Sequence, residues 1–332
     1  MTVLAPTKLP PGIRRYRRHE TADSSANAGG DVPRLQLLLL GATVALAGCA
    51  TPDGGGVRGS KTLLKWHTGD DPRAAPPAGG EDQAEKPPAD PRAEPIVTDR
   101  PDFTEASSTV GKGRVQLETG YTYVRDRSDG VLRSAHSYPE ALLRVGLFAD
   151  WFEVRVGQNL GSERAGADGF ATGFDDLYVG AKLGLTEQAG VLPEAAVVLQ
   201  ATVPTGSGSR TNGRVLPGVN LLYGWDVIED AITCGGSVQG LSTVDDNRHT
   251  YLTLAQSFTV GYTLTERVGA YTEWFAFYPS GATSPGIGPE HYFNGGFTFR
   301  PVPHIQFDVR AGVGLNRRAD DFFAGSGVSV RY

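Results

Sequence analysis

The segment Ile305–Leu315 reads IQFDVRAGVGL and holds the pattern that decides the fold. Apolar residues occupy every second position, and Gln306, Asp308 and Arg310 lie between them. Successive side chains of a strand point to opposite faces, so this strand has one apolar face and one polar face. The polar face carries an acid and a base near mid-strand, which indicates contact with water or ion pairing. Similar segments recur up to the terminal Tyr332, as is typical of a transmembrane β-barrel.

Twelve such segments follow one another from residue 114 onward, and they predict an all-β fold, a transmembrane antiparallel up-and-down β-barrel. Most short connections alternate with longer ones, as in outer-membrane barrels with periplasmic turns and external loops. The predicted strands are Arg114–Arg125, Glu140–Phe148, Phe152–Asn159, Asp176–Leu185, Glu194–Val203, Gly218–Asp226, Ile232–Leu241, Thr250–Tyr262, Val268–Tyr278, Tyr292–Arg300, Ile305–Leu315 and Phe322–Tyr332. The barrel therefore extends from 114 to 332.

Composition limits the class of protein. The chain has 332 residues and a net charge of −6, without the basic excess typical of nucleic-acid-binding proteins, so we expect no nucleic-acid partner. No run of about 20 apolar residues is present to form a transmembrane helix. A barrel strand needs only about 9–11 residues, so a membrane location stays compatible with the sequence. The sequence holds two cysteines, Cys49 and Cys234, which do not indicate a disulfide framework.

The first 97 residues are predicted to lie outside the barrel. Leu35–Gly48 is a short apolar run typical of an export signal, which we assign to residues 1–49. The four residues ending in Cys49 resemble a bacterial lipobox, which implies lipidation of Cys49; an ordinary signal peptide cleaved nearby is the alternative. Residues 50–97 are rich in Gly, Pro, Ala and charge and predict a disordered periplasmic linker. The expected location is the bacterial outer membrane, with the N-terminal region in the periplasm.

The chain end carries a second export feature. Gly327, Val330 and Tyr332 resemble the insertion signal of outer-membrane proteins, although Gly325 replaces its usual polar residue. The expected partners are therefore the barrel-assembly machinery and outer-membrane lipid, together with a small-molecule permeant.

Charged residues on the predicted lumen face form a candidate site. A two-residue turn at Ala149 and Asp150 would place Arg144 opposite Arg155, and facing like charges cost up to about 1 kcal/mol without a counter-charge. We hypothesise a mixed-charge zone with a basic bias that selects permeants by charge. Ion-paired side chains that brace a narrow barrel are the alternative. The candidates are Glu118, Arg144, Glu153, Arg155, Lys182, Asp308 and Arg310.

A polar lead-in segment, residues 98–113, precedes the first strand. It contains Asp99, Arg100, Asp102, Phe103 and Glu105 and is too polar to span a membrane. Two interpretations stay open: a plug folded into the periplasmic mouth with Phe103 as its apolar contact, or an extended stretch that caps the rim.

This lead-in segment also carries a family resemblance. The run TDRPDFTE at Thr98–Glu105 resembles the opening motif of an outer-membrane family named for a putative MetA pathway of phenol degradation. Further similar segments are Arg114–Tyr123, Pro139–Leu147, Gly173–Leu185 and Leu192–Gly206, so the resemblance covers Thr98 to Tyr332. It implies a barrel related to channels for small molecules, including aromatic or hydrophobic ones.

Three classes of function compete for this barrel. A passive channel for small molecules agrees best with the pattern, and a non-conducting structural or anchoring barrel is the alternative. The lumen is expected to contain Tyr178, Phe275, Phe277 and Phe323, which suit either a hydrophobic path or a blocked lumen. A phospholipase-type enzyme requires a Ser beside an activating His on one outward strand face, and no histidine here has that spacing. The sequence indicates neither a metal site nor a cofactor.

Overall fold

The computed structural model describes residues 61–64, 94–128, 130–166 and 169–332. The predicted export signal, including Cys49, and most of the predicted linker lie outside the described residues. Within the described part of the chain, no helix has the length and apolar character needed to cross a membrane.

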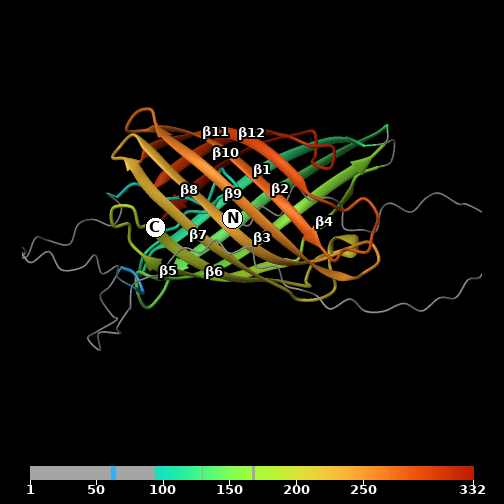
Figure 1. Ribbon diagram of the computed structural model, residues 1–332, viewed down its shortest axis with the longest axis horizontal. Helices are drawn as coiled ribbons and strands as arrows, with labels where there is room; N and C mark the ends of the chain where they lie inside the picture. The colour runs from blue at the N-terminus through green and yellow to red at the C-terminus, as the bar shows by residue number, and fades with distance from the viewer. Residues whose placement is uncertain (1–60, 65–93, 129, 167–168) are drawn as a thin grey trace, which may run out of the picture.

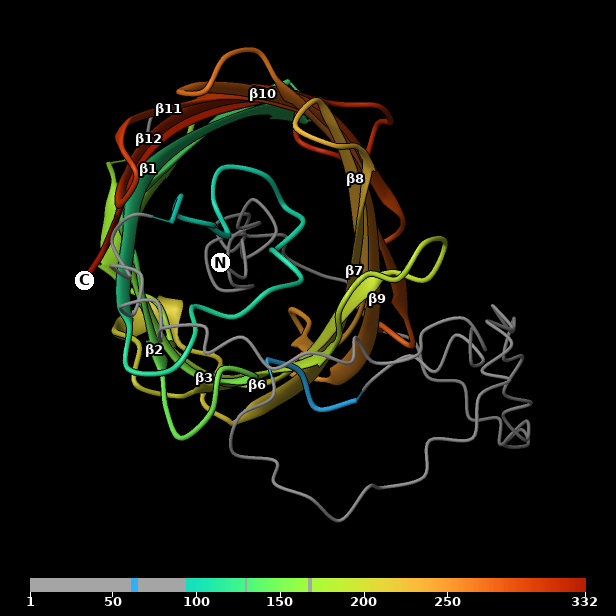
Figure 2. The same cartoon turned by 90° about the vertical axis from the view of Figure 1, so that its left-hand side faces the viewer.

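The chain forms an antiparallel sheet that closes into a barrel (Figures 1 and 2). Consecutive strands pair along the sheet, and closure comes from the pairing of β1 with β13. The strands are β1 (Val115–Ser128), β2 (Val131–Gly146), β3 (Phe152–Ala165), β4 (Ala171–Phe174), β5 (Leu177–Thr186), β6 (Glu194–Val203), β7 (Leu216–Ile228), β8 (Ile232–Val244), β9 (Thr250–Thr263), β10 (Val268–Ser280), β11 (Glu290–Val302), β12 (Ile305–Gly314) and β13 (Phe322–Arg331).

The wall has twelve strands, as the sequence predicts. The short β4 and the longer β5 both pair with β3 and together make one wall strand, interrupted at Asp175 and Asp176. An even number of wall strands brings the start of β1 and the end of β13 to the same end of the barrel. We call this the terminal end and the opposite one the loop end.

The wall is apolar outside, and its inner face is mainly polar, apart from an aromatic cluster described below and a few small apolar groups. In β12 the residues Gln306, Asp308 and Arg310 are buried, whereas Phe307 and Val309 are 48% and 51% exposed. The same alternation places Leu117, Leu143 and Leu199 on the outside. An apolar exterior on a closed sheet suits contact with lipid, because the long wall strands are paired on both sides; the short β4 pairs with β3 alone among the described strands.

Two predicted loops are wrong in extent. The predicted connection between Arg125 and Glu140 is largely strand, since β1 continues to Ser128 and β2 begins at Val131. The region after Asn159 likewise continues as β3 and then β4. Polar residues such as Ser134 interrupt the apolar alternation there, but the ladder hydrogen bonds do not depend on it.

Residues 94–113 form a loop whose middle lies inside the barrel, and we call them the plug segment. In the view along the barrel, this part of the chain forms a loop within the ring of strands (Figure 2). Asp99, Arg100, Phe103 and Glu105 are all at most 6% exposed. The middle of the predicted lead-in segment therefore lies in the lumen, whereas Lys112 and Gly113 at its end are exposed.

Candidate functional site

The plug segment enters and leaves the lumen at the terminal end. Near its start, the Ile96 amide donates to the Pro303 carbonyl in the turn between β11 and β12, 2.7 Å away. Near its finish, the Thr109 hydroxyl donates to the carbonyl of Asp150, in the turn between β2 and β3. The Val110 amide donates to the Glu153 carboxylate at 2.9 Å. The middle of the segment is thus a loop whose two limbs share one exit.

Arg144 and Arg155 face each other across β2 and β3, as the sequence predicts. The wall itself neutralises Arg144: its Nε donates to Glu153 at 2.8 Å and its Nη1 to Glu118 at 3.0 Å. A longer contact of 3.4 Å joins Arg144 to Asp99 of the plug segment. Arg144 therefore keeps two acidic partners that belong to neighbouring strands.

Arg155 and Lys182 depend far more on the plug segment. Arg155 Nη1 donates to Glu105 at 2.9 Å and its Nη2 donates to Asp99. Lys182 Nζ donates to the Asp99 carboxylate at 3.0 Å and to the Ala106 carbonyl at 2.8 Å. The only wall acid near Arg155 among the described ion pairs is Glu153, at 3.6 Å. These two cations are thus satisfied mainly by groups outside the wall.

Both plug carboxylates are held ionised by this basic surface. Burial alone would raise the pKa of Glu105, but nearby cations, of which Arg155 has the largest effect and Lys182 adds to it, lower this pKa to about 2. Burial also opposes ionisation of Asp99, yet Arg144 and Lys182 hold its pKa well below the usual range. The contact between plug and wall is therefore a contact of full charges.

Arg100 lies where the first and last strands meet. Its guanidinium donates to Glu140 of β2 at 2.9 Å and to Asp308 of β12 at 3.2 Å. It lies over Gly120 and Gly327, which are cross-strand partners in β1 and β13. A Cβ at either glycine would come within 2.3 Å of an Arg100 atom, so a larger residue would displace the guanidinium.

Two further predicted site residues are Asp102 in the plug segment and Arg310 in β12. Both lie close to the contact between the plug segment and the wall. Arg310 donates to the Pro101 carbonyl of the plug segment at 2.8 Å and to the Thr122 hydroxyl at 2.9 Å. Asp102 is half-buried, and its enclosure together with the Glu273 carboxylate raises its pKa. All the predicted site residues other than Cys49 therefore lie in the lumen, around the plug segment.

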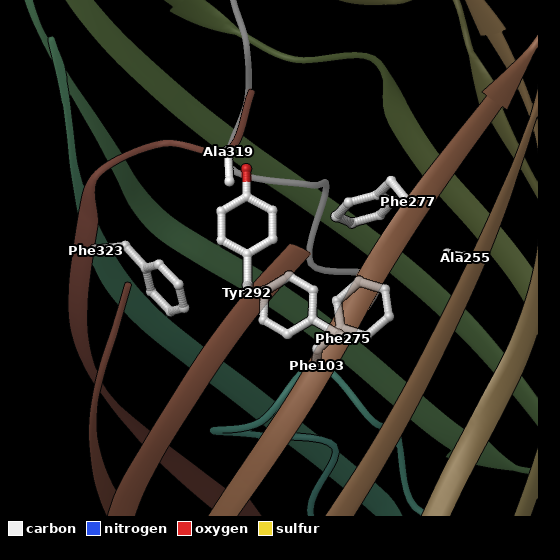
Figure 3. Close-up of a cluster of buried hydrophobic side chains, with 7 residues drawn as sticks. All are labelled: Phe103, Ala255, Phe275, Phe277, Tyr292, Ala319 and Phe323. Atoms are coloured by element: carbon white, nitrogen blue, oxygen red, sulfur yellow. The ribbon is translucent and has the colours of Figure 1, made fainter. Parts of the chain in front are cut away.

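The tip of the plug segment inserts into an aromatic cluster. Phe103 stacks on Phe275 with ring centroids 4.7 Å apart and meets Phe277 edge to face at 5.4 Å (Figure 3). Glu273 fixes the tip by accepting the Phe103 and Thr104 amides at 2.8 and 2.7 Å. The cluster comprises Phe103, Ala255, Phe275, Phe277, Tyr292, Ala319 and Phe323. The predicted inward direction of Phe275, Phe277 and Phe323 is correct.

Glu140, Gly120 and Gly327 were not predicted as parts of this site. A signal for Glu140 was present, because the alternation that turns Arg144 inward also turns Glu140 inward. The role of the glycines had no sequence signal, since it depends on a side chain that enters from the plug segment.

Comparison with known proteins includes a solved channel structure whose likeness supports the fold. No curated protein matches the chain. Among solved structures, an outer-membrane channel from Pseudomonas putida F1 has a TM-score of 0.58 and 10% sequence identity, covering 68% of this chain and 98% of that chain. The NanC porin has a TM-score of 0.41 and 8% identity, covering 66% of this chain and 98% of that chain. The translocator domain of the autotransporter NalP from Neisseria meningitidis has a TM-score of 0.42 and 11% identity, covering 66% of this chain and 88% of that chain.

The comparison of sequences identifies a family, whereas the comparison of structures identifies only the fold. A family model matches residues 98–332, which include the whole barrel and most of the plug segment. The chain is an outer-membrane β-barrel and belongs to the family described as "Putative MetA-pathway of phenol degradation".

Proposed function

We propose that this barrel is a passive outer-membrane channel for small molecules, and that the plug segment restricts its lumen. The terminal end faces the periplasm in this proposal, because short turns of outer-membrane barrels lie on that side. Permeants would cross the lumen beside the plug segment or after it leaves.

One observation carries the proposal: a separate segment, with aromatic side chains of the wall around its tip, fills the middle of the barrel. The wall beneath it is formed by small or polar residues, such as Gly120, Ser257 and Gly327. The segment is held in part by hydrogen bonds and ion pairs with the wall, which water can replace when the segment moves. A wall built for permanent closure would meet across the axis with its own side chains.

The charges of the wall support selection of permeants. Without the plug segment, the zone near the terminal end would hold three cations, Arg144, Arg155 and Lys182, and two acids, Glu118 and Glu153. Such a zone favours anions, because a ring of net positive charge lowers the barrier for them. This is the charge zone that the sequence predicts, with its basic bias on neighbouring strands.

A permanently closed anchoring barrel is the second candidate, favoured by the buried tip of the plug segment. Phe103 is 6% exposed and stacks within the aromatic cluster. If this contact never opens and no path passes beside the plug segment, the barrel conducts nothing.

Single-channel recording of the full chain in planar bilayers distinguishes the two. We expect discrete conductance steps from the natural protein, and larger steps from a variant in which residues 98–107 are replaced by a Gly/Ser linker of equal length. Val309→Ala, on the lipid face, serves as the matched control. Absence of current from both the natural protein and the linker variant, with correctly folded barrels, would support the anchoring role instead.

A further inference from the structure

The lumen contains cations of two kinds. Arg144 and Arg310 are satisfied by wall groups and by backbone carbonyls, apart from one 3.4 Å contact of Arg144 with Asp99. Arg155 and Lys182 receive their close carboxylates from the plug segment. This division singles out Arg155 and Lys182 as a site whose close carboxylates come from outside the wall.

The geometry at this site is that of carboxylate recognition. Glu105 binds Arg155 through both of its oxygens, at 2.9 and 3.2 Å from the two terminal nitrogens. Asp99 bridges the same guanidinium and the Lys182 ammonium, through its two different oxygens. Two carboxylates thus share one guanidinium, and the planar fork of arginine suits such paired contacts.

Neighbouring residues hold the two cations in place. Arg155 lies opposite Gly180 on β5, which leaves space for its side chain in the lumen. Its guanidinium also lies 5.9 Å from the centroid of the Tyr178 ring, and the Tyr178 hydroxyl donates to Gln200 at 3.0 Å. Lys182 lies opposite Glu153. A site fixed by the wall in this way loses little conformational entropy when a ligand binds.

We propose that Arg155 and Lys182 form a binding site for small organic dicarboxylates, and that Asp99 and Glu105 occupy it as an intramolecular ligand. This inference deepens the proposed channel function and rests on it for the transport of such anions. A permeant with two carboxylates replaces the contacts of Asp99 and Glu105 and so competes with the plug segment. The contact that restricts the lumen is then also the contact that a permeant loosens.

Binding is tested by calorimetry on the full chain in detergent, with succinate as the probe and acetate as the single-carboxylate comparison. The variant Asp99→Asn/Glu105→Gln keeps the shape of the plug segment but removes both competing charges. We expect it to bind succinate roughly tenfold or more tightly than the natural protein, because an intramolecular ligand has a high effective concentration. Succinate should bind more tightly than acetate.

Further substitutions in this variant identify the residues. Arg155→Gln should weaken succinate binding by roughly tenfold or more, since two charge-assisted hydrogen bonds are lost. Arg155→Lys keeps the charge and should reduce the preference for succinate over acetate. Arg133→Gln, the matched control, removes a cation that pairs with Glu163 and Asp126 of the wall and with no plug residue, and it should change binding by less than about twofold. Equal succinate affinity in all these variants would contradict the proposal that Arg155 binds the dicarboxylate.

Channel recordings separate the site from the proposed function. In a gradient of dipotassium succinate, the reversal potential should show anion preference that Arg155→Gln reduces. Succinate binding without any current would remove the transport role and retain the site. Current with no measurable succinate binding would overturn the site and leave the channel function standing.

Discussion

Single residues in the lumen act in pairs that belong to different parts of the chain. Arg155 meets Glu105, Arg100 meets Asp308, and Phe103 meets Phe275. In each pair one partner comes from the plug segment and the other from the wall. A substitution of either partner therefore changes the docking of the segment before it changes the barrel.

Phe103→Ala should loosen the plug segment. Truncation of a buried phenylalanine costs about 3–5 kcal/mol, from lost burial and the cavity left behind. We expect the open state to become much more frequent in single-channel records. Phe103→Leu keeps most of the volume and should have a far smaller effect. Equal open frequencies for the two variants would mean that the aromatic cluster does not hold the tip.

The docking of the plug segment should weaken in strong acid. The pKa of Glu105 is lowered to about 2, from an unfolded value of about 4.3. Its contribution to stability is therefore fully present above about pH 4.3 and is lost as pH falls towards about 2. Conductance at a series of pH values measures this, with Glu105→Gln as the comparison. If both proteins respond alike between pH 5 and pH 2, the effect belongs to other groups.

Among the elements, strands are read from the sequence better than the connections that join them. The twelve wall strands follow from alternating apolar residues, because lipid selects an apolar outer face at every second position. The strand extensions around Val131 and Ala165 were missed, because beyond the membrane both faces meet water and the alternation fades. The plug segment was recognised as polar and unable to span, but its place in the lumen depends on partners distant in sequence, such as Asp308.

Asp245 joins two connections at the loop end. Its carboxylate accepts the Asn247, His249, Thr283 and Ser284 amides, so it links the turn after β8 to the loop after β10. Asp245→Ala should free this loop, with hydrogen exchange at Thr283 and Ser284 faster by roughly tenfold or more. Asp245→Asn keeps one acceptor oxygen, so its exchange rates should lie between those of the natural protein and those of Asp245→Ala. Unchanged exchange in the alanine variant would show that the loop is held by other contacts.

The molecule as a whole is closed by strands that lie far apart in sequence, and Arg100 spans the closure. Its partners Glu140 and Asp308 flank the β1–β13 pair, so one side chain links four consecutive wall strands. Arg100→Ala leaves two buried carboxylates without their cation and should lower the free energy of barrel unfolding by about 3–5 kcal/mol. Denaturant titration in detergent measures this. Adding Glu140→Gln and Asp308→Asn should restore part of the loss; a triple variant no more stable than Arg100→Ala would contradict this explanation.

The shared exit of both limbs of the plug segment has an electrical consequence. The segment from 98 to 105 carries three acids and one arginine, a formal charge of −2, and it can leave only through the terminal end. A membrane potential does about 2.3 kcal/mol of work on each elementary charge that crosses about 100 mV. A potential negative at the loop end should therefore expel the segment, and the opposite polarity should seat it. The barrel would then rectify: current–voltage curves should be asymmetric, and Asp99→Asn/Glu105→Gln should make them more symmetric.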